Sequence, residues 1–283
     1  MDRLKGTFTG ERALYDISNK EIYDSVFEDG ESPLKECDHI RVLNSEFRYK
    51  YPLWYSHDIE CIDVTFLEMS RSGIWYTNNI TIRNSDIYAP KLFRRCDGVK
   101  IINSTFYKAQ ETFWGCKNIE LENVKAKGDY FCFNCENIKV NNFFLDGNYA
   151  FDGAKNIEIN KAVLNSKDSF WNTENVVIRD SKIVGEYLGW NSRNLTFINC
   201  EISSHQGFCY IDGLKLINCK ITDTDLCFEL CKNIDATIVG GHVDSIKNPI
   251  SGRITVNSVG EIILDKRYVD PNKTIIEVMK TNV

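Results

Sequence analysis

A repeat of roughly 19 residues runs through most of the chain and constrains its fold more than any other feature. Segments such as NNITIRNSDI from Asn78, DGVKIINSTF from Asp97 and DGLKLINCKI from Asp212 share one pattern. Taking the first apolar residue of each copy as an anchor, successive anchors lie 18 to 21 residues apart. The anchors are Ile22, Ile40, Ile59, Ile80, Val99, Ile119, Ile138, Ile157, Val176, Leu195, Leu214, Ile234 and Ile254. Such a period indicates a solenoid of stacked coils.

Residue types at fixed offsets from the anchor predict short strands and turns. The anchor and the second residue after it are apolar, which is the alternation of a half-buried strand. Asn or Asp stands four residues after most anchors, and Asn or Gly stands one residue before most of them. These residue types tolerate a positive φ and favour turns. We therefore expect three short strands and three turns per coil, with asparagine side chains of stacked coils forming ladders.

The pattern predicts an all-β fold, a single-stranded right-handed parallel β-helix of about 12 coils. The intervals are too uneven for a left-handed hexapeptide helix, and in a leucine-rich repeat the Asn falls one position later. No linker or composition break interrupts the copies, so we expect a single domain over 1–283. Within it we expect an N-terminal cap at 1–19, coils at 20–249, and a C-terminal coil and cap at 250–283, where the pattern fades.

Composition narrows the classes of function. The net charge of −6 argues against nucleic acid, which requires a basic surface. No run of about 18 apolar residues predicts a membrane span. The N-terminal sequence lacks the apolar segment of a signal peptide, so the eleven cysteines are expected to be reduced thiols. These features favour a cytoplasmic protein, with a bacterial cytosol as the default location.

The sequence resembles known proteins at two levels, a wide fold family and a narrower family within it. The coils resemble the pectin-lyase-like right-handed β-helices, which include pectate lyases and polygalacturonases. The segments FTGERALY, DGESPLKE, KYPLWYS, APKLFRR and GEYLGWNS look like a family of functionally uncharacterised bacterial proteins with that fold. The closer resemblance implies the fold and no activity. The acidic motifs of polygalacturonases are absent from the sequence, so the wider resemblance carries over no catalytic residue.

The sixth residue before each anchor is almost always apolar and is predicted to point inward, which places Phe170 inside. Small residues three before the anchor form a second inward column. Together these columns explain the CFNC motif of Cys132 to Cys135 as two stacked core residues rather than a redox or metal pair. Because neighbours on an extended chain point to opposite faces, Trp171 is predicted to point outward.

All five tryptophans fall in the outward column five residues before the anchor, which we call the aromatic column. Its members are Lys35, Trp54, Trp75, Arg94, Trp114, Phe133, Asp152, Trp171, Trp190, Cys209 and Glu229. With coils about 4.8 Å apart, Trp54 to Trp190 is predicted to span roughly 34 Å. Exposed aromatic patches of this size normally mark binding surfaces.

Two functions fit such a face. Rings with nearby polar groups suit the binding or processing of an oligo- or polysaccharide. The candidate substrate-binding residues are Trp54, Trp75, Trp114, Phe133, Trp171, Trp190, Tyr130, Tyr149, Tyr187, Arg95, Lys91, Asn134, Asn172 and Asn191. The alternative is a non-enzymatic scaffold whose rings form a homo-oligomer or protein-partner interface. Neither reading requires a membrane or nucleic acid partner.

The charged residues of this face are the candidates for catalysis. Asp152 has apolar neighbours in the column, which favours the protonated form that a general acid needs. The backbones of Asp152 and Asp168 are expected to lie about 11 Å apart. Their side chains could shorten this to the separation of the two carboxyl groups in an inverting glycosidase. Glu111 and Asp129 lie on adjacent coils and form an equally plausible pair. A polysaccharide lyase would need Arg94, Arg95 or Lys91 to neutralise a uronate carboxylate, and a base to take the α-proton.

No cofactor or metal is expected. His39 and His57 fall on neighbouring coils near Asp38 and Asp58, but in surface turns, so they are not predicted to form a metal site.

Overall fold

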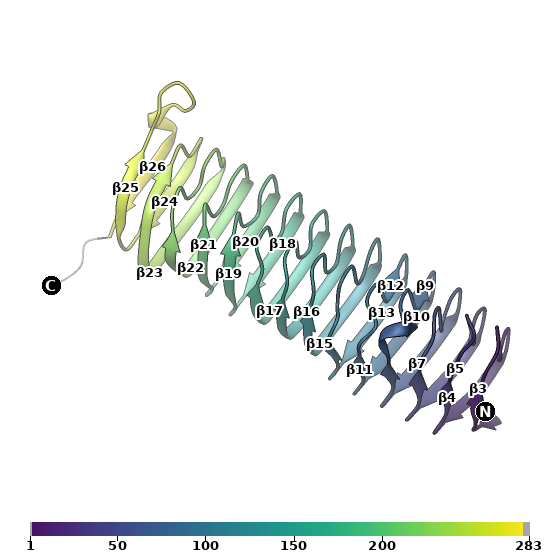
Figure 1. Cartoon of the computed structure of the whole chain (residues 1–283). Helices are drawn as coiled ribbons and strands as arrows, with labels where there is room; N and C mark the ends of the chain where they lie inside the picture. Colours follow the sequence, from purple (N-terminus) through teal and green to yellow (C-terminus); the bar gives the residue numbers. More distant parts are fainter. Residues whose placement is uncertain (1, 280–283) are drawn as a thin grey trace. The chain divides into compact units, whose positions relative to one another are not determined.

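The computed structural model describes residues 2–279, which divide into two compact units, Met1–Asp146 (unit 1) and Gly147–Val283 (unit 2). Each unit is a parallel β-helix, and within each the strands of successive coils lie side by side (Figure 1). The predicted all-β solenoid is therefore confirmed, whereas the predicted single domain stays a prediction. None of the helices in the described residues has the length and apolar character needed to cross a membrane.

Unit 1 consists of paired strands and one 3₁₀ helix. Its elements are β1 (Asp2–Leu4), β2 (Thr7–Phe8), β3 (Ser18–Tyr23), β4 (Val26–Phe27), β5 (Asp38–Leu43), β6 (Glu46–Phe47), β7 (His57–Ile62), β8 (Thr65–Phe66), η1 (Glu68–Ser70), β9 (Ile74–Trp75), β10 (Asn78–Arg83), β11 (Asp86–Ile87), β12 (Phe93–Arg94), β13 (Asp97–Ile102), β14 (Thr105–Phe106), β15 (Lys117–Lys127) and β16 (Glu136–Asp146). Each long strand pairs in parallel with the long strand of the next coil, as Ile40 of β5 pairs with Ile59 of β7.

Unit 2 continues the same alternation in fewer, longer strands. Its elements are β17 (Lys155–Asn165), β18 (Glu174–Arg179), β19 (Lys182–Glu186), β20 (Arg193–Ile198), β21 (Glu201–His205), β22 (Asp212–Thr224), β23 (Ile234–Lys247), β24 (Gly252–Val256), β25 (Val259–Ile263), η2 (Pro271–Lys273) and β26 (Thr274–Val278). Here too the predicted anchors pair, as Val176 of β18 does with Leu195 of β20.

The ends of the chain differ from the prediction. The described residues form about 15 coils rather than 12, because β1 already pairs with β3 and the C-terminal β24 and β26 still pair in parallel. The first and last predicted anchors are wrong by two residues, since Ile22 pairs with Val42 and Ile254 with Ala236. The residues that occupy the anchor position there are Lys20 and Gly252, which the apolar pattern could not detect.

The core consists of apolar side chains stacked from coil to coil. In unit 1 the rings of Phe27, Phe47 and Phe66 stack with centroids 4.5 and 5.0 Å apart. In unit 2 Phe151 stacks on Phe170 at 5.1 Å. All eleven cysteines are buried and free, including Cys132 and Cys135, as core stacking predicts.

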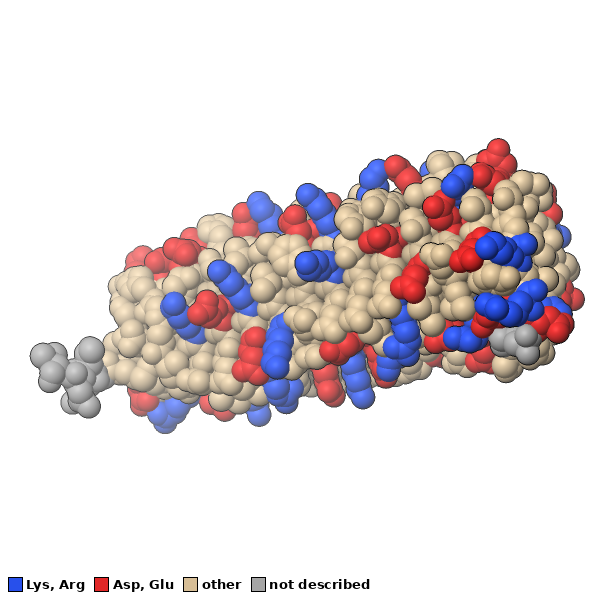
Figure 2. Space-filling model, turned by 90° about the horizontal axis from the view of Figure 1, so that it is seen from below, with Lys and Arg blue, Asp and Glu red and all other residues tan. Residues whose placement is uncertain are grey.

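Charged side chains on the outer surface pair across coils. In unit 1 the guanidinium of Arg41 contacts the carboxylates of Glu21 at 3.0 Å and Glu60 at 2.9 Å. Acidic and basic side chains lie close together on the face shown in Figure 2. The register places Arg41 directly between Glu21 and Glu60, so opposite charges face each other across neighbouring coils, a favourable arrangement.

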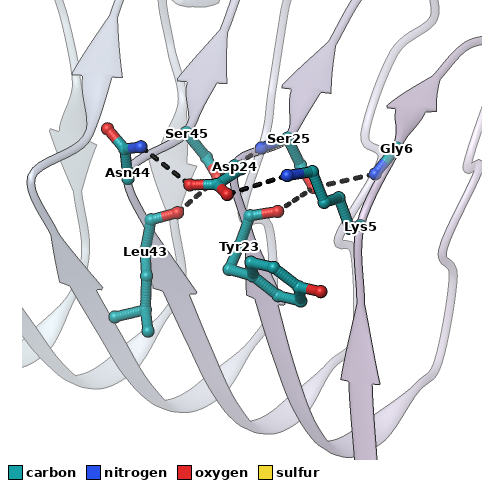
Figure 3. Close-up of polar contacts among 8 residues, drawn as sticks. All are labelled: Lys5, Gly6, Tyr23, Asp24, Ser25, Leu43, Asn44 and Ser45. Atoms are coloured by element: carbon teal, nitrogen blue, oxygen red, sulfur yellow. Dashed lines mark hydrogen bonds and ion pairs between the residues drawn. The ribbon is translucent and has the colours of Figure 1, made fainter.

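The turns between strands are held by side-chain ladders. At one corner of unit 1, Ser25 Oγ accepts from the amide of Gly6, and Ser45 Oγ accepts from the amide of Ser25, both near 3 Å (Figure 3). Beside it, Asp24 accepts from Lys5 and from the amide of Asn44. The predicted asparagine ladders are present in both units, as in the chain of side-chain amides from Asn142 through Asn123 to Asn103.

The third side of the coil differs from the predicted strand. Within residues 2–279 only β9 and β12 form a pair of strands there, Arg94 and Trp114 form an isolated bridge, and in most other coils the segment is a turn or a bend. In unit 2, Asp168, Phe170 and Asn172 all have φ between 54° and 59°, the left-handed region. Their amides still bond to adjacent coils, as Phe170 does to the carbonyl of Ala150 at 2.9 Å. Hydrogen bonds to the adjacent coils therefore satisfy the backbone amides of this segment, although it is not an extended strand.

Candidate functional site

The predicted inward and outward directions on the third side are confirmed for Phe170 and Trp171, but the outward prediction is wrong for Cys209, which is buried. Phe170 is 0% exposed, whereas Trp171 is partly exposed beside it. The other four tryptophans, and Phe133, are also partly exposed. The aromatic column therefore lies on the outside of the turn segment in each unit. Because it includes residues of both units, its predicted length of roughly 34 Å stays a prediction.

In unit 1 the indoles of the aromatic column are fixed by stacking and by hydrogen bonds. The rings of Trp54 and Trp75 are 5.2 Å apart between centroids and 9° apart in plane. Each indole N–H donates to a backbone carbonyl of the next coil, Trp54 to Ser72 at 2.6 Å and Trp75 to Lys91 at 3.2 Å. The polar edge of each ring is therefore satisfied by the protein itself.

Arg94 continues this stack where the column has no ring. Its guanidinium carbon lies 4.6 Å from the ring centroid of Trp75 and 4.8 Å from that of Trp114. Glu111 contacts Arg94 at 3.7 Å and Lys91 at 3.1 Å. Both faces of the cation thus meet indoles, an arrangement favoured by cation–π attraction. The predicted lyase role would require this paired guanidinium to leave its stack.

A second stack runs beside the first. Tyr55 and Tyr76 are 4.8 Å apart and 6° apart in plane, and Arg95 lies 5.9 Å above the ring of Tyr76. Further along, Trp114 contacts Phe133 at 5.0 Å and the edge of Tyr130 at 6.4 Å. Unit 1 therefore contains two parallel pairs, Trp54–Trp75 and Tyr55–Tyr76, whereas Trp114 and Phe133 are tilted by 42°.

Unit 2 arranges its rings differently. Trp171 and Trp190 are 5.8 Å apart and tilted by 37°, and Tyr149 meets Trp171 edge to face at 89°. Tyr187 meets Trp190 at 75°, and the indole N–H of Trp171 donates to the carbonyl of Tyr187 at 2.8 Å. The ring of Trp190 also contacts Tyr210 at 4.8 Å with a tilt of 45°, so neither indole of unit 2 has a parallel stacked partner among these rings, and both are partly exposed.

Amides and a carboxylate border these rings in unit 2. The side-chain amide of Asn191 donates to Asn172 at 2.9 Å, and that of Asn172 donates to Asp152 at 3.0 Å. Both asparagines are exposed and Asp152 is partly exposed. In unit 1 the corresponding Asn134 is also exposed. The Asn191–Asn172–Asp152 chain presents hydrogen-bonding groups in a row beside the two indoles.

Asp168 lies on the coil of Trp171, next to the coil of Asp152. Partial burial and the nearby negative charge of Glu186 raise the pKa of the Asp168 carboxyl, and Lys167 opposes this only in part. Lys167 is itself paired with Glu186 at 2.8 Å. A raised carboxyl pKa is the property expected of a general acid. Glu111, by contrast, is occupied by two cations.

The histidines lie apart from the aromatic column. Asp38, His39 and Asp58 offer donor atoms within 4.8 Å of one another, and His57 is outside this group. His205 contacts Asp225 at 2.7 Å, and His242 contacts Ser258 at 2.8 Å.

Unit 2 has two shallow hollows that were not predicted from the sequence. They lie on the outer side of β17, β19, β21 and β22, with volumes of about 390 and 420 Å³. Lys182 and Glu201 line both. These residues alternate with core residues as on any strand, so the sequence carries no signal that separates them from ordinary surface positions.

Three solved structures illustrate what the chain is similar to at low sequence identity. A mutant tailspike protein of E. coli bacteriophage HK620, in complex with a pentasaccharide, has 10% identity and a TM-score of 0.50 over 96% of this chain and 67% of that one. PfbA, a surface adhesin of Streptococcus pneumoniae, has 10% identity and a TM-score of 0.34 over 80% and 71%. The A-module of the mannuronan C-5 epimerase AlgE4 of Azotobacter vinelandii has 10% identity and a TM-score of 0.31 over 98% and 87%.

The likeness to the tailspike supports the fold, a right-handed pectin-lyase-like β-helix. No curated protein sequence matches the chain at a significant level. The sequence pattern of one family, described as "Protein of unknown function (DUF3737)", matches residues 4–277. That match covers nearly all the coils described above, so the chain belongs to this family.

Proposed function

We propose that this protein binds carbohydrate, as an oligo- or polysaccharide, on the turn face of unit 2. The site, called the unit 2 patch, consists of Tyr149, Asp152, Asp168, Trp171, Asn172, Tyr187, Trp190 and Asn191. The observation that carries the proposal is the tilt of 37° between Trp171 and Trp190 beside the amide chain of Asn191 and Asn172. Sugars pack C–H faces on aromatic rings and exchange hydroxyl hydrogen bonds with such amides.

Unit 1 offers a poorer sugar site. Trp75 has Trp54 on one side and Arg94 on the other, so a sugar ring would have to displace a stacked partner. The likeness to the pentasaccharide-bound tailspike is in keeping with a carbohydrate ligand, but it is a likeness of fold at 10% identity. The choice of unit 2 therefore rests on ring geometry.

If the bound sugar is also cleaved, Asp168 is the proposed general acid and Asp152 its partner. The raised pKa of Asp168 favours the protonated form, whereas Asp152 accepts a hydrogen bond from Asn172 as a carboxylate does. This pairing corresponds to a glycoside hydrolase. The lyase alternative needs Arg94, Arg95 or Lys91. Arg94 is stacked on indoles and paired with Glu111, Lys91 is paired with the same carboxylate, and Arg95 lies over Tyr76.

A glycan microarray followed by calorimetry tests the proposal. The variant Trp171→Ala/Trp190→Ala is expected to lose binding of any glycan found with the wild type. The matched control Trp54→Ala/Trp75→Ala changes the same residue types in unit 1 and is expected to keep the affinity. Equal loss in both variants, or no loss in the first, would overturn the assignment to unit 2. Loss of product release in Asp168→Asn, with binding retained, would identify an enzyme.

The second candidate is a scaffold whose rings form an interface with another copy or a protein partner. The parallel Tyr55–Tyr76 stack favours it, because Tyr55 remains 43% exposed at the edge of a flat aromatic surface. Acrylamide quenching of tryptophan fluorescence, combined with light scattering, separates the two functions. An oligomer with protected indoles supports the interface, and a monomer with accessible indoles leaves the sugar site.

We further propose a cytoplasmic location. All eleven cysteines are free, which suits a reducing compartment. Fractionation of cells that produce the full-length protein would test this, and recovery outside the cytosol would contradict it.

A further inference from the structure

One turn of unit 1 departs from the side-chain pattern of its neighbours. At the position before the anchor, the following coils carry Asn79, Gly98, Asn118 and Asn137, all with positive φ. The two adjacent coils of β5 and β7 carry His39 and Asp58 there instead, with φ of 53° and 52°. Both replacements are residue types that bind transition metals through nitrogen and oxygen.

Two carboxylates lie beside the ring of His39. Its Nδ1 lies 2.9 Å from Oδ1 of Asp38, and its Nε2 lies 3.7 Å from Oδ2 of Asp58. The other oxygen of Asp58, Oδ1, accepts from the side-chain amide of Asn79 at 3.0 Å. Nε2 of His39 and Oδ2 of Asp58 are therefore close together, and the second oxygen of Asp58 already has a partner.

The separation of 3.7 Å between Nε2 and Oδ2 is too long for a good hydrogen bond. It is slightly longer than the separation of about 3.4 Å between two ligand atoms of a tetrahedral ion with bonds of about 2.0–2.2 Å, so a small side-chain movement would bring both atoms onto one ion. A carboxylate on the second ring nitrogen is the usual partner of a metal-binding histidine, because it sets the tautomer and raises the basicity of the ligand. The carboxylate of Asp38 lies 2.9 Å from that nitrogen.

We propose that His39 and Asp58 bind a divalent transition-metal ion of the zinc class, through Nε2 and Oδ2. Asp38 acts as the positioning residue, and Asn79 orients the Asp58 carboxylate. His57 pairs in register with Asp38 and is exposed, but its donor atoms lie outside the cluster, so its side chain would have to turn to serve as a third ligand. Water completes the coordination of this exposed site. The ion would join neighbouring coils and so stabilise unit 1 by mass action.

Titration of chelator-treated, reduced full-length protein with Co²⁺ and Zn²⁺ tests the site. We expect one ion per chain by calorimetry, with a Co²⁺ spectrum that lacks thiolate charge-transfer absorption, because the eleven thiols are buried. His39→Gln and Asp58→Asn are expected to abolish binding. Asp38→Asn is expected to weaken it 10–100-fold, as loss of such partners typically does. His205→Gln is the control and should bind as the wild type does.

Thermal unfolding gives a second readout. Zn²⁺ should raise the unfolding midpoint of the wild type and of His205→Gln, and leave that of His39→Gln unchanged. Circular dichroism of each variant without metal shows whether it is folded. Absence of binding at millimolar Zn²⁺, or equal binding by the folded His39→Gln variant, would overturn the proposal and leave the cluster as an ion pair. A loss in His57→Gln would identify the third ligand.

Discussion

The indole rings of Trp54 and Trp75 lie parallel, 5.2 Å apart between centroids and 9° apart in plane. Each ring therefore contributes one face to the other, although both rings are on the outside of the coil. These two rings therefore stabilise the stacking of neighbouring coils, whether or not the aromatic column also binds a ligand.

The stacked pair is expected to be energetically coupled. Trp54→Ala and Trp75→Ala should each lower the free energy of unfolding, and the double variant should lose less than the sum. A coupling of about 0.5–1.5 kcal/mol is typical of aromatic pairs. Urea unfolding of the four proteins in the cycle measures it. Strict additivity would show that the rings do not interact in solution.

Asn123 is predicted to contribute through both its side chain and its backbone conformation. It has φ of 54°, donates to Asn103 at 2.9 Å and accepts from Asn142 at 2.8 Å. Asn123→Ala should lose about 1–2 kcal/mol, because the ladder is broken and alanine is strained at positive φ. Asn123→Gly breaks the same ladder without that strain, so it should recover roughly 1 kcal/mol in urea unfolding. Equal losses would exclude a backbone contribution.

The cysteines are predicted to be unreactive in the folded protein. Burial raises the pKa of Cys37 to about 11 and that of Cys209 to about 12. Native protein at pH 8 should therefore react with a thiol reagent only as fast as it opens, and denatured protein should release eleven thiols. The folded state holds these protons more tightly than the unfolded chain, so stability should fall as pH rises from about 9 toward 11. Rapid labelling of native protein would contradict this burial.

Asp168 is expected to destabilise the fold when it ionises. Because its pKa is raised in the folded state, the native protein binds more protons than the unfolded chain at pH values just above 3.8. Stability should therefore fall as pH rises through that window. Asp168→Asn, which also tolerates positive φ, should raise the unfolding midpoint at pH 7, and the gain should shrink toward pH 4.

The matched comparison for Asp168 is Asp152→Asn. Asp152 accepts from Asn172, so its loss should bring no stabilisation at pH 7. Thermal unfolding of both variants across pH 4 to 7 checks the pair. If Asp168→Asn lowered the midpoint at pH 7, Asp168 would be acting as a stabilising carboxylate.

The sequence by itself determined the solenoid, because apolar residues recur at the inward positions of the coils and Asn, Asp or Gly recurs at the turns. It identified Phe170 as buried and Trp171 as outward, and it placed the asparagine ladders. It misjudged Ile22 and Ile254, since the end coils carry Lys20 and Gly252 where the pattern requires an apolar residue. A local pattern fails there because register is set by pairing with the neighbouring coil.

Only the tertiary structure decided what the outward residues do. The column assigns Trp75 and Trp171 to equivalent positions, yet one is stacked within 9° of its neighbour and the other is tilted by 37°. Likewise, sequence spacing could not show that the Nε2 of His39 lies 3.7 Å from Asp58 while its Nδ1 lies 2.9 Å from Asp38. Side-chain torsions and contacts between coils set these orientations. A repeat pattern gives the position of each residue along the chain, but it contains no information on torsions or on such contacts.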